Sequence, residues 1–467
     1  MQNQCRRIVA APCAARYVRA TAGLRPSAVK DALPTAISEA FSSAAVVFFV
    51  RARSERRRPP GFALKSASSV SKLHPATRRR TLRMLAAVPY LLLPRSVLAA
   101  PSRRWTITGA RVEEFDSLDA VMQRLLQRYA VRAGSLAVAR QRKLLFARGY
   151  TWAEPDYPVT QADSPFRLAS VSKAFTAAVI YQLLQAKKLE LSLPVFPWLG
   201  LDRAALPGQT VDPRLATITV QQLINHRGGW DSRAANFDPV FSMRRIARRL
   251  GLRAGPSSRD IARFMVGEPL QFTPGTQDHY SNFGYVMLGL VAEKAGAAAF
   301  HDLVRDQVAA PLGIDKVFRA RTRRDQRLPG EGFYDQPGTG LTPEFPDREV
   351  RVPLPYGGEG WLTESMTAGG GLAASAGAVA RMIGHYAVWG LGLRRANQNW
   401  ARSGAMAGTS SLAISRPDGL DLCFVVNTRN FGGRQGDSGS VARYQACPRF
   451  GAASKIVDYT VTTILTT

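Results

Sequence analysis

The sequence predicts an α+β fold of the α/β sandwich type. One antiparallel sheet is built from both termini of the body and is flanked by helices, with a helical insert between. Two strand patterns support this prediction. Residues 134–140 and 143–150 have the composition of two strands joined by a tight turn. Near the other end, residues 410–416 and 420–427 form a second pair around a Pro-Asp-Gly turn. Helical periodicity dominates between the two strand pairs. We therefore expect a catalytic or binding site where the sheet meets the helices.

The other predicted elements follow in chain order. Ser117 is a suitable cap for a helix whose apolar residues recur at 118, 121, 122, 125 and 126. An amphipathic helix is expected to begin near Ser170, because one buried stripe follows it, made of Phe175, Val179, Ile180, Leu183 and Leu184. Residues 190–350 are predicted to be helix and loop, with a long apolar helix over 283–295. Gly369-Gly-Gly-Leu372 then leads into a helix predicted over 376–389.

Positive charge is concentrated at the beginning of the chain. The formal net charge is +29, and residues 1–100 hold 18 Lys and Arg against 3 Asp and Glu. A charge of this size would suggest nucleic acid or an anionic membrane as partner. The body, however, contains no basic motif interleaved with aromatic residues. It also contains no apolar run as long as the roughly 18 residues that a membrane span needs. We therefore expect no specific nucleic-acid partner and no transmembrane span, and the sequence leaves the oligomeric state open.

The first 100 residues lack the pattern of a folded domain. We expect residues 1–77 to be disordered or a mis-annotated leader, with translation starting near Met84 or slightly upstream. Residues 78–100 have a basic region, an apolar region and a small-residue end, which together predict an export signal and a periplasmic or secreted protein. The alternative is a basic tail beside a short core helix. The folded body is then 101–430, and residues 431–467 form an atypical Gly-, Ser- and Arg-rich tail.

Cysteine and histidine usage gives little support for a metal or cofactor. Cys5 and Cys13 lie in the leader, which leaves Cys423 and Cys447 for the body. A disulfide between these two and a pair of unpaired thiols are both compatible with the sequence. The five histidines are scattered, and no CxxC or zinc-type spacing occurs. We expect no metal and no cofactor.

Ser170 and Lys173 carry the first chemical signal. They stand at i and i+3 of the predicted helix, so both side chains share one face. A serine hydroxyl is a poor nucleophile at neutral pH, and an amine one turn away that takes its proton would activate it. The same tetrapeptide occurs at Ser69-Val-Ser-Lys72, but Pro75 forbids a continuing helix there, so we interpret that copy as chance.

Two further polar clusters follow along the chain. Phe272-Thr-Pro-Gly275 precedes Tyr280-Ser-Asn282 at the beginning of the long apolar helix. Arg402-Ser403-Gly404-Ala405 stands immediately before the last strand pair. Neither cluster identifies a site by itself. A buried tyrosine is usually a core residue with a hydrogen-bonded hydroxyl, and an isolated Arg-Ser-Gly sequence carries almost no information.

The three clusters in this order, with Gly369-Gly-Gly-Leu372 between the second and the third, resemble the serine beta-lactamase superfamily, specifically class C beta-lactamases, DD-peptidases and related esterases. The resemblance covers roughly residues 110–430 and implies a beta-lactamase/transpeptidase-like fold. It implies Ser170 as nucleophile, Lys173 as its proton acceptor and Tyr280 as the second acid/base. The resemblance also implies substrate-binding roles for Asn282, Arg402, Ser403, Gly404 and Ala405, where Asn282 contacts the substrate amide and the backbone N–H groups of Ser170 and Ala405 form an oxyanion hole.

The third cluster departs from the family pattern. Arg402 stands where the family usually has Lys or His. Arginine keeps the positive charge and can grip a substrate carboxylate, but it stays protonated and cannot shuttle protons. Ala407 replaces a common proline.

The sequence therefore predicts an exported serine hydrolase that forms an acyl-enzyme on Ser170. Its substrate would be a small molecule: a beta-lactam, a carboxylic ester or a D-alanyl peptide. A non-catalytic protein that binds peptidoglycan fragments or lactams is the alternative.

Overall fold

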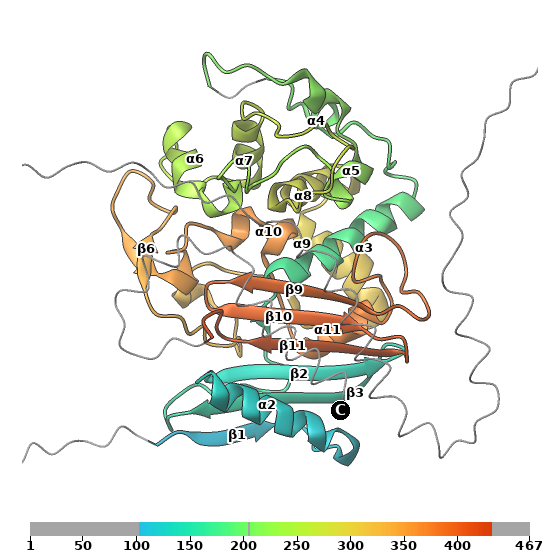
Figure 1. Cartoon of the computed structure of the whole chain (residues 1–467), viewed down its shortest axis with the longest axis vertical. Helices are drawn as coiled ribbons and strands as arrows, with labels where there is room; N and C mark the ends of the chain where they lie inside the picture. Colours follow the sequence, from blue (N-terminus) through green and yellow to red (C-terminus); the bar gives the residue numbers. More distant parts are fainter. Residues whose placement is uncertain (1–101, 204–205, 432–467) are drawn as a thin grey trace, which may run out of the picture. The chain divides into compact units, whose positions relative to one another are not determined.

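The computed structural model describes residues 102–203 and 206–431 (Figure 1). The predictions for the leader, the export signal, residues 432–467 and the pairing of Cys447 lie outside the described residues. Cys423 is buried without a disulfide among the described residues, and burial raises the pKa of its thiol.

A six-stranded antiparallel sheet joins both ends of the body, as the strand patterns predict. Its central pair is β2 with β11, in which Gly134 lies opposite Val426 and Ala137 opposite Cys423. The strand order is β1 (Arg104–Thr108), β3 (Lys143–Ala153), β2 (Ala133–Arg140), β11 (Leu420–Val426), β10 (Thr409–Ser415) and β9 (Trp400–Met406). The two hairpins are confirmed, whereas the outer strands β1 and β9 were not predicted.

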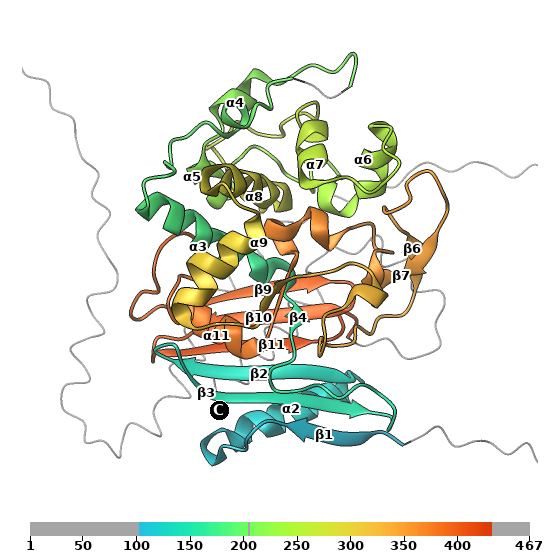
Figure 2. The same cartoon turned by 180° about the vertical axis from the view of Figure 1, so that it is seen from behind.

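The two faces of the sheet carry side chains of different size. On one face, Leu136, Val138 and Phe424 pack with the helix α2 (Asp116–Arg128). On the other, Ala137, Ala139 and Cys423 belong to the main core, which includes α11 (Ala376–Ile383). Because successive side chains of a strand point to opposite faces, the small residues let α11 approach closely, while large ones fill the space under α2. Figures 1 and 2 show these helices on opposite faces.

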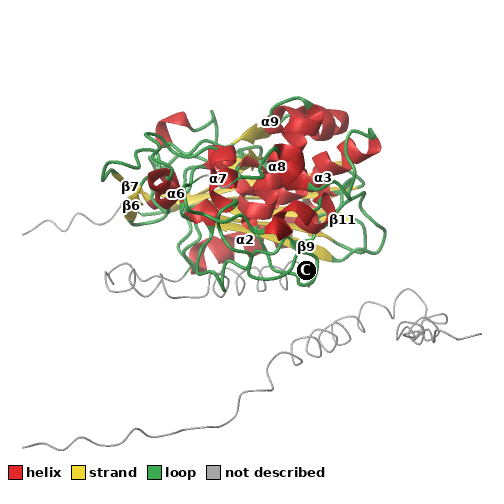
Figure 3. Cartoon of the chain, turned by 90° about the horizontal axis from the view of Figure 1, so that it is seen from above, coloured by secondary structure: helices red, strands yellow, loops and turns green. Residues whose placement is uncertain are grey.

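The helical insert lies beyond the β9 edge of the sheet, and Figure 3 shows its helices from above. Its two central helices are α3 (Ser172–Gln185) and α8 (Asn282–Gly296). Ser281 caps α8 by accepting the Gly284 N–H, which places Asn282 at the first position. The other helices are α4 (Val195–Leu199), α5 (Val220–Ile224), α6 (Met243–Arg249), α7 (Ser258–Met265), α9 (Phe300–Leu303) and α10 (Thr367–Gly370). Short strands complete the fold: β4 (Phe166–Arg167), β8 (Leu372–Ala374) and β5 (Val317–Arg319), and the pair β6 (Thr339–Leu341) and β7 (Arg351–Pro353).

Three predicted boundaries or patterns are wrong. Ser117 does not cap α2, because a 3-10 turn over Glu113–Phe115 leads into the helix and Phe115 occupies the cap position. Helix α3 is not amphipathic, since its residues 172–180 are all buried. Helix α11 ends at Ile383 rather than at 389, so the rest of that stretch is a loop. The long apolar helix is confirmed at 282–296.

No single helix in the part of the chain that the structure describes is long and apolar enough to cross a bilayer. Only the bent pair formed by Asn282–Gly296 and Phe300–Leu312 meets the length and composition criteria, and it does so jointly.

Candidate active site

Ser170 lies in a 3-10 turn, η3 (Ala169–Val171), directly before α3. The residue before it, Ala169, has a φ of +46°, in the left-handed region that costs a residue with a Cβ. This strained turn presents the hydroxyl of Ser170 to two partners. Its Oγ lies 3.1 Å from Nζ of Lys173 and 2.7 Å from the hydroxyl of Tyr280. The structure therefore brings together the three residues that were predicted as the catalytic group, although Tyr280 is 110 residues further along the chain.

Lys173 is fully buried, and its amine is surrounded by acceptors. Nζ donates to the carbonyl oxygen of Gly369 and, at 2.9 Å, to Oδ1 of Asn282. Burial, and then the charge of Arg402, hold the pKa of Lys173 well below its usual value. A neutral amine has two hydrogens and one lone pair. With the hydrogens on Gly369 and Asn282, the lone pair is left for the hydroxyl hydrogen of Ser170, which is the arrangement a general base requires.

Tyr280 is a proton donor in this arrangement. Burial raises the pKa of Tyr280 to about 12, although the bond to Ser170 and the charge of Arg402 oppose that change. The phenol is therefore neutral at physiological pH and donates to Oγ of Ser170. Lys173 can therefore accept a proton and Tyr280 can donate one, and both lie within hydrogen-bond distance of Oγ of Ser170.

His226 fixes the backbone on which Tyr280 is carried, and sequence reasoning did not include it in the site. Its Nδ1 accepts the Ser281 N–H at 3.1 Å, and its carbonyl accepts the His279 N–H at 3.0 Å. The ring packs on Tyr280, with centroids 4.6 Å apart. Burial, with the charge of Arg402, lowers the pKa of His226 to about 3, so the imidazole is neutral with its proton on Nε2.

Arg402 is 1% exposed, and its positive charge acts on the pKa values of Lys173 and Tyr280. Its Nε donates to the carbonyl of Val388 at 2.7 Å, and its guanidinium lies 3.7 Å from the ring centre of Trp389. Its two terminal nitrogens have no hydrogen-bond partner among the described residues. Trp389 is anchored by a bond from Nε1 to the carbonyl of Ala401. Trp389 thus covers one face of the guanidinium, which is not exposed to a substrate carboxylate in this structure.

The backbone of β9 lies against the turn that holds Ser170. Arg402 and Gly404 are buried on one face of this strand, whereas the intervening Ser403 is exposed, so the structure does not bring Ser403 into the cluster. Ala405 and Ser170 both line a cavity of about 20 Å³. Asn282 lines it too, and its other walls include Val240, Phe241, Met366, Gly369, Gly370 and Met406.

We expect Gly404→Ala to slow acylation of Ser170 by about 100-fold, because misplacement by about 1 Å has costs of this order. A Cβ at this position would lie 2.3 Å from the carbonyl oxygen of Leu168 and 2.8 Å from the backbone nitrogen of Ser170. Gly377→Ala in α11 is the matched control, since its Cβ would meet Leu144 at 3.4 Å, close to ordinary contact. Acylation rates with an activated ester and the melting temperatures of both variants check this. An unchanged rate in Gly404→Ala would contradict the geometry.

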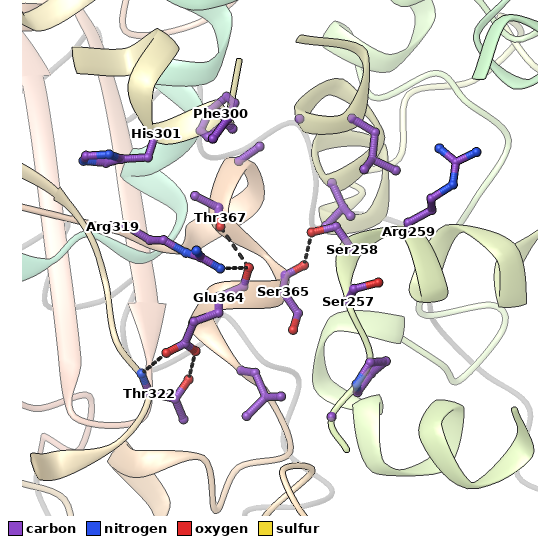
Figure 4. Close-up of a pocket in the computed structure, with 18 of the residues that line it drawn as sticks. Ser257, Ser258, Arg259, Phe300, His301, Arg319, Thr322, Glu364, Ser365 and Thr367 are labelled. Atoms are coloured by element: carbon purple, nitrogen blue, oxygen red, sulfur yellow. Dashed lines mark hydrogen bonds between the residues drawn. The ribbon is translucent and has the colours of Figure 1, made fainter. Parts of the chain in front are cut away.

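A larger cavity of about 500 Å³ lies apart from the predicted catalytic group and includes none of its residues (Figure 4). Thr367 and Ala368 of α10 line this cavity, whereas Gly369 and Gly370 line the small cavity beside Ser170. Figure 4 shows hydrogen bonds across it, from Ser258 to the carbonyl of Ser365 and from Thr322 to Glu364. Several of its polar groups are thus bonded within the protein, whereas Nε2 of His301 has no hydrogen-bond partner among the described residues.

The described residues contain no group of three or more His, Cys, Asp or Glu side chains that could hold a metal ion.

A family model described as Beta-lactamase matches residues 118–447. Protein flp of Staphylococcus aureus (strain MW2) is 25% identical over 231 residues, which are 49% of this chain and 43% of that protein. The probable fimbrial assembly protein FimD, serogroup H1, of Dichelobacter nodosus is 30% identical over 176 residues, 38% of this chain and 39% of that protein. The matches thus span less than half of either relative.

Two solved structures are similar to this chain. A D-stereospecific amidohydrolase from Streptomyces sp. is 21% identical, with a TM-score of 0.49 over 70% of this chain and 98% of that chain. EstCE1, a hydrolase with promiscuous acyltransferase activity, is 18% identical, with a TM-score of 0.48 over 70% of this chain and 96% of that chain.

Proposed function

The chain belongs to the Beta-lactamase family, and from this we propose that it is a serine hydrolase that cleaves an amide or ester through an acyl-enzyme on Ser170. One observation carries the proposal. Oγ of Ser170 lies 3.1 Å from the amine of Lys173 and 2.7 Å from the hydroxyl of Tyr280. Since the pKa of Lys173 is lowered and that of Tyr280 is raised, a base and an acid meet at the nucleophile.

In the acylation half-reaction, Ser170 gives its proton to Lys173 while Oγ bonds to the substrate carbonyl carbon. The carbonyl oxygen becomes an oxyanion, for which we propose the backbone N–H groups of Ser170 and Ala405 as donors. The bond to the leaving group then breaks, and the leaving group takes the proton of Tyr280. The positive charges of Lys173 and Arg402 stabilise the resulting phenolate.

In deacylation, a water molecule gives its proton to the phenolate of Tyr280 as its oxygen bonds to the acyl carbon. The bond from that carbon to Oγ breaks, and the ammonium of Lys173 returns the proton to Ser170. Each group ends in its initial protonation state, so Arg402 takes part only through its charge.

Within this reaction class, beta-lactam and D-alanyl substrates carry a carboxylate, whereas simple esters do not. The only guanidinium of the third cluster, that of Arg402, is 1% exposed and covered by Trp389. Because this guanidinium is not available to bind a substrate carboxylate, a carboxylic ester is the second candidate substrate, beside a beta-lactam. The sequence of residues 78–100 supports a further proposal, that the protein is exported.

The test is to mix the full chain with p-nitrophenyl butyrate and, separately, with benzylpenicillin, and to measure intact mass and peptide maps. We expect an acyl adduct on the peptide that contains Ser170, and the faster reagent identifies the substrate class. Absence of both an adduct and hydrolysis with either reagent in folded protein would contradict the proposal and would favour a protein that binds without turnover.

A further inference from the structure

A buried carboxylate stands behind the predicted site on the side of Asn282. Asp238 is 7% exposed and precedes the 3-10 turn η5 (Pro239–Phe241). Its Oδ1 accepts the Val240 N–H at 3.1 Å, and its Oδ2 accepts from Nδ2 of Asn282 at 2.8 Å. A buried charge is costly unless it is hydrogen-bonded. The Val240 N–H and Nδ2 of Asn282 therefore stabilise the carboxylate of Asp238, and Asn282 belongs to the predicted site.

The bond to Asp238 determines which way the Asn282 amide points. An ionised carboxylate only accepts hydrogen bonds, so the NH₂ end of the amide must face Asp238. The oxygen end then faces Lys173, and the separation between Oδ1 and Nζ is 2.9 Å. Asp238, Asn282, Lys173 and Ser170 thus form one continuous hydrogen-bonded chain that ends at the nucleophile.

We propose that Asp238 is a positioning residue for acyl transfer, which holds the Asn282 amide so that its oxygen occupies one hydrogen of Lys173 and leaves the lone pair on Ser170. This inference rests on the proposed function. If the amide were reversed, its NH₂ group would face Nζ and would compete for the lone pair that has to take the proton of Ser170.

The charge of Asp238 acts on the same amine. Burial and the charge of Arg402 lower the pKa of Lys173, whereas Asp238 raises it. A base whose pKa is far below the working pH is neutral but weak, and the best general base has a pKa near that pH. Asp238 therefore limits how far Arg402 weakens the base. The groups that face Lys173 are the charged Arg402 and Asp238, the rings of Tyr280 and Tyr285, 5.0 and 5.6 Å from Nζ, and the neutral His226.

Two substitutions separate charge from hydrogen bonding. Asp238→Asn keeps an oxygen acceptor but removes the charge, whereas Asp238→Ala removes both. Asp212→Asn is the matched control, because Asp212 also caps a 3-10 turn that begins with proline and accepts the N–H of the second residue, Arg214. Loss of a turn cap should therefore affect both variants, and Asp212→Asn in addition removes an ion pair with the guanidinium of Arg214.

The first experiment measures kcat, KM and the pH profile of ester hydrolysis by the full-length variants. For Asp238→Asn, we expect the acidic limb of kcat/KM to move to lower pH by roughly one unit, because a raising influence on the Lys173 pKa is lost. For Asp238→Ala, we expect kcat to fall by at least about tenfold with little change in KM, since general-base contributions are on the order of 10²–10⁴. A pH profile and a kcat that match those of Asp212→Asn would overturn the proposal.

The second experiment needs no substrate. In protein with ¹³C-labelled lysine, the titration of Lys173 is followed by NMR and assigned with Lys173→Met. We expect the midpoint to fall in Asp238→Asn and to stay at the wild-type value in Asp212→Asn. If wild-type protein hydrolyses no ester or lactam, the proposed function fails, while this titration still tests Asp238. An unchanged midpoint would overturn the role of its charge.

Discussion

Ser170→Ala is expected to lower hydrolysis and acyl-adduct formation by at least about 10³-fold, because removing a nucleophile leaves only binding and oxyanion stabilisation. The variant should fold normally. The hydroxyl that the substitution removes borders a small cavity of about 20 Å³. The hydrogen bonds of Lys173 to Gly369 and Asn282 do not depend on this hydroxyl. Intact mass after exposure to an activated ester, together with steady-state rates, measures the effect.

The chain supplies its own control for that experiment. Ser69-Val-Ser-Lys72 repeats the tetrapeptide of Ser170 to Lys173, so Ser69→Ala makes the same chemical change in an identical local sequence. Activity should remain at the wild-type level in Ser69→Ala. If this variant lost activity while Ser170→Ala kept it, the assignment of the nucleophile would be wrong.

Lys173→Met is expected to lower kcat by about 10³-fold, within the range that a general base contributes. Methionine approximates the length of the side chain but has no basic nitrogen. Lys188→Met removes an exposed lysine just beyond the end of α3 and should leave kcat unchanged. Single-turnover acylation rates distinguish loss of chemistry from loss of binding. Acylation of Lys173→Met at the wild-type rate would show that another group takes the proton.

The same substitution should weaken the dependence of stability on pH. The pKa of Lys173 is lowered in the native state, so between that value and the unfolded value of about 10.4 the unfolded chain binds more protons. Stability then rises with pH across this interval, and at neutral pH the buried amine is destabilising. Methionine removes this titration, but it also leaves the carbonyl oxygen of Gly369 and Oδ1 of Asn282 without the donor Nζ. Urea unfolding of Lys173→Met should therefore give a free energy of unfolding with a weaker dependence on pH than that of the wild type. A pH dependence as steep as that of the wild type would contradict the lowered pKa of Lys173.

The predicted catalytic group emerged from the sequence because its members stand in short motifs with fixed local geometry. Lys173 follows Ser170 by one helical turn, and Tyr280 precedes a helix with a recognisable cap at Ser281. Asp238 gave no such signal. It stands 44 residues before Asn282 in an Asp-Pro turn, a combination that usually indicates only a cap. Only the packing of the helical insert makes them neighbours.

Three features that the sequence did not predict correctly were missed for different reasons. Strand β9 contains Arg402 and Gly404 and lies at the edge of the sheet, where alternation of apolar residues is weak. Helix α3 was expected to have a polar face, but it passes through the middle of the molecule, so helical spacing alone did not reveal how much of it is buried. Trp389 was placed in a helix that ends six residues before it, and its stacking on Arg402 depends on that loop.

The pairing of β2 with β11 also determines when the molecule can fold. Gly134 and Val426 are opposite each other although about 290 residues separate them in the chain. On a ribosome, the hairpin of β2 and β3 emerges early, and one edge of β2 remains unpaired until β10 and β11 have been made. Ser170 likewise emerges long before Gly404, the residue whose backbone supports its turn. Closing so long a loop makes sheet assembly slow relative to helix formation, and the nucleophile acquires its working geometry only after the last strands have been made.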